Sequence, residues 1–177
     1  RMVVAFVVLL NLALPARADL AACQKLWQSG PKTLGNLGLS ATQNYEARRR
    51  GLGYALKYGP RNGSHATLFF FDQGRRKISP SAVRTEFREA TATIELVKKN
   101  SGGKPRDTKA GKDGSGSEVI AYLARMDFGG RGGVEYLTVG QAGHCIVKLR
   151  YTTAGNPEAA DRNFARVRSD LLTFYNE

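Results

Sequence analysis

One segment, residues 79–99, combines the signals of an amphipathic α-helix. Ser79 has the hydroxyl of a good N-cap, and Pro80 follows at the first helical position, where its missing N–H costs nothing. Apolar residues then recur at spacings of four, three, four and three, which predicts one buried stripe made of Val83, Phe87, Ala90, Ile94 and Val97. The opposite, polar face is expected to meet solvent and carries Arg84, Glu86, Arg88, Glu89 and Glu95.

Six shorter segments have the alternation or the apolar runs of β-strands. They are residues 41–50, 53–58, 66–72, 118–128, 134–139 and 144–151. Segment 66–72 is apolar on both faces, which predicts a central strand covered on both sides. Asn156 and Pro157 then begin a second amphipathic helix, whose stripe is Ala160, Phe164, Val167, Leu171 and Phe174.

The order of these elements is three strands, a helix, three strands and a helix. Strands joined by short turns pair antiparallel, and each helix must bury its stripe on the sheet. We therefore expect one α+β sandwich domain over residues 41–177, with about six strands in the order βββαβββα and one helix on each face. Residues 100–117 are rich in glycine and cations and poor in apolar side chains, so they are expected to form a mobile surface loop.

The first 18 residues have the features of an export signal. An apolar run at residues 3–14 is too short to span a bilayer, and a small-x-small cleavage site at Ala16-Arg17-Ala18 follows it. We expect cleavage between Ala18 and Asp19, an N-terminal arm at residues 19–40, no transmembrane segment in the mature chain, and a periplasmic or secreted destination.

The chain has two cysteines, Cys23 and Cys145, and three fates are open for them. In an oxidising compartment they can pair as a disulfide that ties the N-terminal arm to the core. Alternatively, both stay free. Finally, Leu20-Ala21-Ala22-Cys23 resembles the lipobox of bacterial lipoproteins, which implies a lipid on Cys23 and a membrane anchor.

The central strands and loops resemble a group of small secreted bacterial proteins of unknown function. The segments that carry the resemblance are residues 45–54, 66–72, 136–138 and 147–150, and it extends over about residues 40 to 175. The layout of that group is similar to the α/β/α sandwich of the PsbP, Mog1 and DcrB type. The resemblance implies this fold and carries no catalytic signature or ligand.

The chain is strongly basic. Removing residues 1–18 would lower its formal net charge from +12 to +10, since Arg1 and Arg17 are lost and no acid is. Such a charge favours lipid head groups or polyanionic glycans, and an exported destination makes nucleic acid an improbable partner. The cations expected to form one basic patch around the ends of the first helix are Arg75, Arg76, Lys77, Lys104, Arg106, Lys109 and Lys112.

Several catalytic and metal-binding patterns fail on residue type or placement. Residues 107–118 have the length of a calcium loop, but Lys109 stands where an oxygen ligand is needed and Lys112 where glycine is needed. Ser101 and Lys104 have the spacing of the serine–lysine acylases, yet they follow a helix rather than open one. We therefore predict no catalytic residue, no metal site and no cofactor.

His144 and Cys145 are neighbours in the sequence and have the residue types of a catalytic base and a nucleophile. Such a pair also needs the two side chains within hydrogen-bond distance. On a strand, however, neighbouring side chains point to opposite faces. The leading hypothesis is therefore an exported, non-enzymatic binding or structural domain with an unidentified partner. Two alternatives are kept: a hydrolase or thiol-dependent enzyme that uses Cys145 or His144, and an envelope-associated binder of polyanions or anionic membranes.

Overall fold

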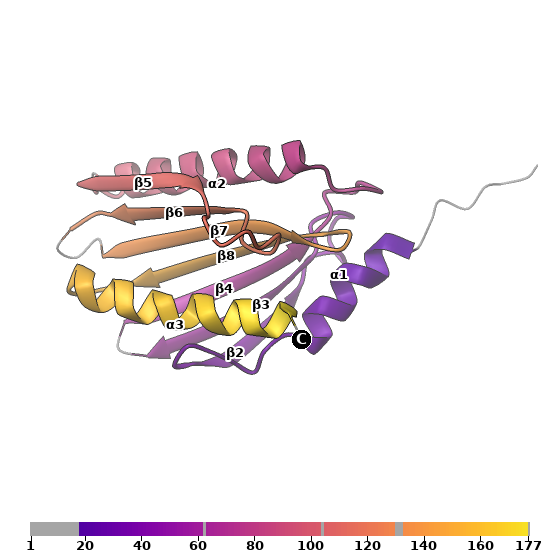
Figure 1. Ribbon diagram of the computed structural model, residues 1–177, viewed down its shortest axis with the longest axis horizontal. Coiled ribbons are helices and arrows are strands. Elements are labelled where there is room, and N and C mark those ends of the chain that lie inside the picture. Colours follow the sequence, from indigo (N-terminus) through magenta and orange to yellow (C-terminus); the bar gives the residue numbers. More distant parts are fainter. Residues whose placement is uncertain (1–17, 62, 104, 130–132, 177) are drawn as a thin grey trace, which may run out of the picture.

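A computed structural model describes residues 18–61, 63–103, 105–129 and 133–176 of the 177-residue chain. Within these residues the chain forms three helices and eight strands (Figure 1). In chain order they are α1 (Ala18–Ser29), β1 (Thr33–Leu34), β2 (Leu37–Asn44), β3 (Tyr54–Arg61), β4 (Ser64–Phe71), α2 (Pro80–Asn100), β5 (Asp107–Lys112), β6 (Tyr122–Asp127), β7 (Val134–Ala142), β8 (Cys145–Thr153) and α3 (Pro157–Asn176).

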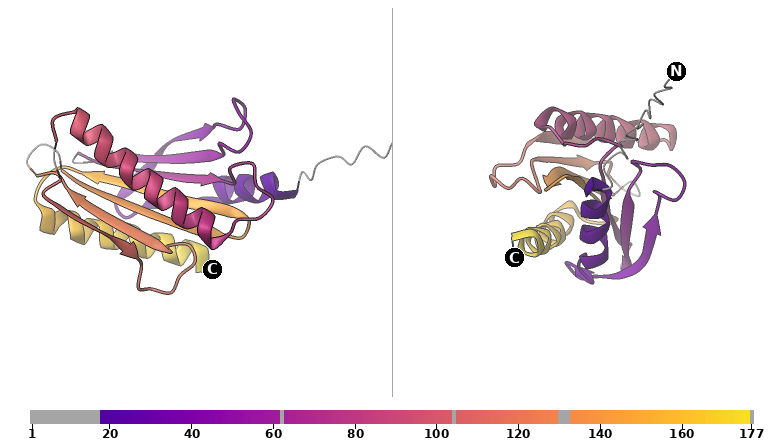
Figure 2. Two further views of the ribbon diagram at one scale, coloured as in Figure 1. Left: turned by 90° about the horizontal axis from the view of Figure 1, so that it is seen from above. Right: turned by 90° about the vertical axis from the view of Figure 1, so that its right-hand side faces the viewer.

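All eight strands belong to one antiparallel sheet with the order β1-β2-β3-β4-β8-β7-β6-β5. The antiparallel pairing of β4 with β8 joins two meanders, β1–β4 and β5–β8. In this pairing Phe70 lies opposite Val147. The sheet is curled like half of a barrel, as Figure 2 shows in its right-hand view. The prediction of a six-strand sandwich is therefore wrong, although the chain remains α+β.

Two strands that the hydrophobic pattern did not indicate account for the difference in number. β1 has only two residues, and β5 lies inside the segment 100–117 that was expected to be a mobile loop. Every residue of β5 is exposed, so its place in the sheet depends on backbone pairing with β6 rather than on buried side chains. The first predicted strand, residues 41–50, also begins earlier, at Leu37.

Helix α2 begins and ends close to the predicted residues, but the burial of two of its side chains differs from the prediction. The Ser79 hydroxyl accepts a hydrogen bond from the Ala82 amide at 3.2 Å and caps the helix. Glu86, expected to face solvent, is only 8% exposed, because Lys148 and Gln73 hold its carboxylate. Val97, expected to be buried, is 54% exposed.

The helices divide between the two faces of the sheet (Figure 1). α2 covers one face, over a core that includes Val83, Phe87 and Ile94. α1 and α3 cover the other face, where Phe164 and Leu171 of α3 lie in the larger core. The Asn156 side chain accepts a hydrogen bond from the Glu158 amide at 2.7 Å, as expected for a residue that precedes a helix.

Residues 19–40, expected to be an arm, include α1, β1 and the start of β2. A disulfide joins Cys23 of α1 to Cys145 at the start of β8, with Cα atoms 5.4 Å apart. Trp27 adds a hydrogen bond from its indole N–H to the Ala55 carbonyl at 3.1 Å. α1 is therefore fixed to the sheet by a covalent bond as well as by packing.

Residues 1–17, on which the export signal is predicted, lie outside the described residues, and cleavage between Ala18 and Asp19 stays a prediction. The sulfur of Cys23 is bonded to Cys145, so a lipid on Cys23 would require that bond to be absent. In the described part of the chain, none of the helices combines the length and the apolar character needed to cross a bilayer.

Candidate functional site

Two loops that are distant in sequence meet at one end of the sheet. The first loop, residues 45–53, joins β2 to β3, and the second, residues 72–79, joins β4 to α2. The Gln73 amide donates to the Gly51 carbonyl at 3.2 Å, and a Cβ added to Gly51 would collide with the Gly74 nitrogen. The two backbones are thus in direct contact, and we call these residues the basic loop pair.

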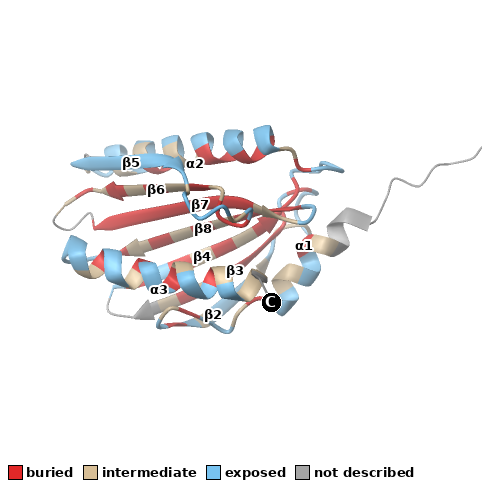
Figure 3. Cartoon of the chain, in the orientation of Figure 1, coloured by how far each residue is buried: buried red, intermediate tan, exposed pale blue. Residues whose placement is uncertain are grey.

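The basic loop pair gathers two runs of cations. Arg48, Arg49 and Arg50 belong to the first loop, and all three are exposed. The second loop contributes Arg75, Arg76 and Lys77, which are exposed as well. In Figure 3 the chain between β4 and α2 includes a stretch in the colour of exposed residues. Within the described residues none of these six cations forms an ion pair.

The acids of the same loops are turned toward the backbone. Glu46 accepts hydrogen bonds from the Gly51 amide at 2.9 Å and from the Gly53 amide at 2.6 Å. Asp72 is 4% exposed and accepts from the Gly74 amide at 2.7 Å. Burial raises the pKa of Tyr54, and the negative charges of Glu46 and Asp72 raise it further, so both carboxylates lie close to the base of the loops. In the described residues, neither acid of the two loops therefore forms an ion pair with the six exposed cations.

The first loop is rigidly built around Leu52. Gly51 and Gly53 flank it with φ angles of 86° and 73°, a backbone conformation that favours glycine. A Cβ on Gly53 would overlap the Phe70 carbonyl oxygen, so this glycine also permits close packing on β4. Both glycines are buried, whereas Leu52 between them is 46% exposed.

The structure divides the basic patch that was predicted from the sequence. Arg75, Arg76 and Lys77 belong to the basic loop pair, and Lys104 lies outside the described residues. The other three cations, Arg106, Lys109 and Lys112, are on or beside β5, which three strands separate from β4 in the sheet. Lys112, at the end of β5, lines a hollow of about 310 Å³ beside Pro80 at the start of α2.

Sequence reasoning missed the contribution of Arg48–Arg50. These arginines stand out in the sequence, but the predicted strand at residues 41–50 includes them as its end. The strand in fact ends at Asn44, whose side chain accepts from the Ala47 amide at 3.3 Å and starts the turn into the loop. The Arg-Arg-Arg-Gly-Leu-Gly run itself was the available signal, since alternating glycines are typical of a loop.

The alternative of an enzyme that uses Cys145 or His144 receives no support at the cysteine. Cys145 is fully buried and bonded to Cys23, so it has no thiol to act as a nucleophile in this form. His144 is exposed in the turn between β7 and β8. Among the described residues no group of three or more His, Cys, Asp or Glu side chains is placed to hold a metal ion.

Two buried carboxylates form ion pairs with basic side chains of neighbouring elements. Lys148 donates to Glu86 at 2.7 Å, and Lys98 approaches Glu135 at 3.1 Å. Arg150 lies 3.7 Å from the other oxygen of Glu135. These contacts attach α2 to β7 and β8, and they give each buried acid a basic partner.

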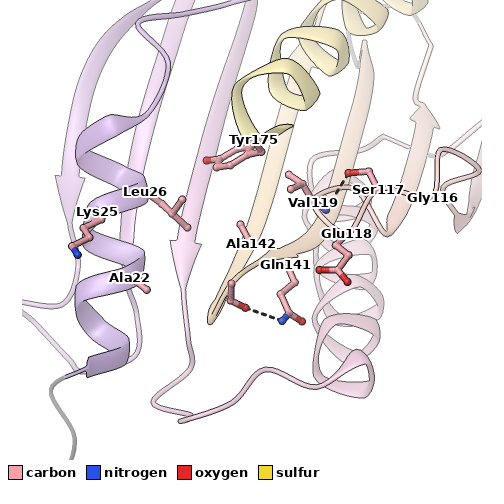
Figure 4. Close-up of a pocket in the computed structure, with 11 residues that line it drawn as sticks. Ala22, Lys25, Leu26, Gly116, Ser117, Glu118, Val119, Gln141, Ala142 and Tyr175 are labelled. Atoms are coloured by element: carbon pink, nitrogen blue, oxygen red, sulfur yellow. Dashed lines mark hydrogen bonds between the residues drawn. The ribbon is translucent and has the colours of Figure 1, made fainter. Parts of the chain in front are cut away.

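A hollow of about 660 Å³ lies between α1, the segment before β6 and the turn from β7 to β8 (Figure 4). Leu26, Val119 and Ala142 form apolar parts of its wall, and Lys25 and Glu118 are exposed at it. The Gln141 side-chain amide donates to the Gly143 carbonyl at 2.8 Å, so this polar group is already occupied. Among the described residues that line the hollow there is no histidine or cysteine.

Comparisons of the chain with protein-family models, with curated proteins and with solved structures found no match.

Proposed function

We propose that the protein is an exported, non-enzymatic binding domain whose binding surface is the basic loop pair and whose partner is anionic. One observation carries the proposal: contact between the loops places six exposed cations on one end of the molecule while the acids of both loops face inward. A surface of one sign attracts oppositely charged partners and accelerates their encounter.

The electrostatic attraction of six cations to an anionic partner is large enough to support binding. Each lysine or arginine near an anionic lipid surface contributes about 1 kcal/mol, so a few cations acting together give useful affinity. The hydrogen bonds from Gly51 and Gly53 to Glu46 hold the first loop in place before any partner arrives. Less conformational entropy is then lost on binding than in a flexible basic tail.

The disulfide supports the exported part of the proposal. Disulfides persist in oxidising compartments and are rare in reducing ones. The Cys23–Cys145 bond agrees with the export signal expected from residues 1–18. The same bond weighs against the alternative of a thiol-dependent enzyme, because that enzyme would need Cys145 free and accessible.

A pair of charge-matched variants tests the proposal. The first, R48Q/R49Q/R50Q, removes three cations from the basic loop pair. The control, K32Q/R162Q/R166Q, removes three exposed cations that lie before β1 and on α3. Both variants have the same net charge, so a difference between them reports location.

Binding is measured to an immobilised sulfated polysaccharide and to anionic vesicles over a series of salt concentrations. We expect the loop variant to bind both probes at least tenfold more weakly and with a smaller salt dependence, because fewer counterions are exchanged. The control is expected to bind almost like the native protein. Equal loss in the two variants would show that only net charge matters and would overturn the proposal.

A further inference from the structure

The basic loop pair also presents an apolar side chain. In the described residues the exposed large hydrophobic side chains are Leu52, Leu96 and Val97. Leu96 and Val97 lie near the end of α2, whereas Leu52 lies in the first loop, two positions after Arg50 and next to Gly51, the residue that contacts the second loop. Leu52 therefore lies on the same two contacting loops as the six exposed cations.

Leu52 is held in this exposed position by the backbone on both sides of it. The Glu46 carboxylate accepts the amides of Gly51 and Gly53, and the Leu52 amide itself donates to the Arg49 carbonyl at 3.3 Å. The Gly51 carbonyl accepts from Gln73 of the second loop. These hydrogen bonds therefore fix the backbone on both sides of the exposed leucine.

The contribution of an exposed leucine beside arginines to binding affinity depends on the type of anionic partner. A sulfated polysaccharide offers charge and water, so an apolar side chain gains little from it. A lipid surface offers anionic head groups and, just beneath them, acyl chains that can take up an apolar side chain. Cations around an apolar tip therefore match the layered chemistry of an anionic membrane surface.

We propose that the partner of the basic loop pair is an anionic lipid surface, with the arginines at the head groups and Leu52 inserted below them. This inference rests on the proposed function, since it names the partner of the same surface. It adds a requirement that charge alone does not make: part of the affinity remains when salt screens the arginines.

The test uses vesicles of equal parts phosphatidylglycerol and phosphatidylcholine, with the sulfated polysaccharide as a lipid-free anion. The variant is Leu52→Ala, and the matched control is Leu96→Ala, which truncates an even more exposed leucine at 59% exposure outside the loops. Thermal unfolding of each variant verifies that it is folded.

We expect Leu52→Ala to reduce vesicle binding about fivefold to tenfold, the effect of withdrawing between one and two methylene groups from the acyl region. Its polysaccharide binding should equal that of the native protein, and Leu96→Ala should change neither. As a second readout, Leu52→Trp should show a blue-shifted emission component when vesicles are added, beyond that of Trp27 in the native protein.

The outcomes separate the two proposals. If R48Q/R49Q/R50Q loses vesicle binding but Leu52→Ala does not, the inference about lipid fails and the proposed function stands. The inference fails in the same way if the native protein binds the polysaccharide and ignores vesicles. If the native protein binds neither probe at low salt, the proposed function fails and the inference fails with it.

Discussion

Removing the disulfide should destabilise the fold strongly, because the bond closes most of the chain into a loop. Cys23 and Cys145 are 122 residues apart. In the chain-entropy model a loop of this length restricts the unfolded state by about 5 kcal/mol at room temperature. Total stabilities of domains are about 5–15 kcal/mol, so the loss is a large share of the whole.

The perturbation is the double variant Cys23→Ala/Cys145→Ala, which avoids leaving a single reactive thiol. Urea unfolding is followed by circular dichroism for the sheet and by the fluorescence of Trp27, the chain's one tryptophan, for α1. Trp27 stacks on Tyr54 with ring centroids 4.9 Å apart, so its emission reports whether α1 is docked. We expect a lower urea midpoint by both probes, with Trp27 responding first.

The result that would refute this reasoning is an unchanged midpoint in the double variant. Intact-mass analysis of the native protein provides the control, since the disulfide lowers the mass by two hydrogen atoms relative to the reduced chain. A native protein that carries two free thiols would contradict the covalent link itself.

Three smaller predictions concern other parts of the structure. Hydrogen bonds from Ser115 and Arg168 outweigh the opposing effect of burial and lower the pKa of Asp113, and Arg125 and Tyr136 do the same for Asp161. A carboxylate whose pKa is lowered by folding stabilises the folded state at pH values above its ordinary pKa of 3.8, and this stabilisation is lost as the pH falls below 3.8. Acid titration followed by circular dichroism should therefore show the free energy of unfolding falling below pH 3.8. The fall should be less steep in Asp113→Asn, which lacks one of the two carboxylates. Gly53→Ala should cost about 2 kcal/mol or more in urea unfolding, because of its positive φ and the contact with Phe70; an unchanged midpoint would contradict the packing of the first loop. Glu46→Gln should lower the local opening free energy of the first loop by about 1–3 kcal/mol, seen as faster amide exchange of residues 51 and 53 without a comparable loss of global stability.

The elements that sequence reasoning identified well are those in which local and tertiary signals agree. α2 and α3 have a cap, a proline at the start and an apolar stripe that meets the sheet, so their limits follow from the residues. β5 could not be found in this way. Its six residues are all exposed, and nothing in a hydrophobic pattern distinguishes a polar edge strand from a loop.

The errors within α2 have a different cause. An apolar stripe predicts which residues lie on one side of a helix. How much of the helix surface is buried depends on the sheet that packs against it. Lys148 on β8 gives Glu86 a partner at the margin of that area, and the carboxylate is buried as a result. Val97 lies on the same margin near the end of the helix, where the cover ends.

The candidate site shows the same limit. The cations of the two loops are visible in the sequence, and Arg75–Lys77 were predicted to form part of a patch. Their association with Arg48–Arg50 depends on the contact of Gly51 with Gly74, which arises from the pairing of β3 with β4. Contacts of that kind come from topology, which the hydrophobic pattern described only in part.

Hydrogen–deuterium exchange of the native protein, with and without anionic vesicles, tests the central claim most directly. If the basic loop pair is the binding surface, amides in residues 45–53 and 72–79 become protected when vesicles are added, and those of α3 and β5 exchange as before. Protection confined to α3 or to the β5 edge, with none in the two loops, would contradict the account.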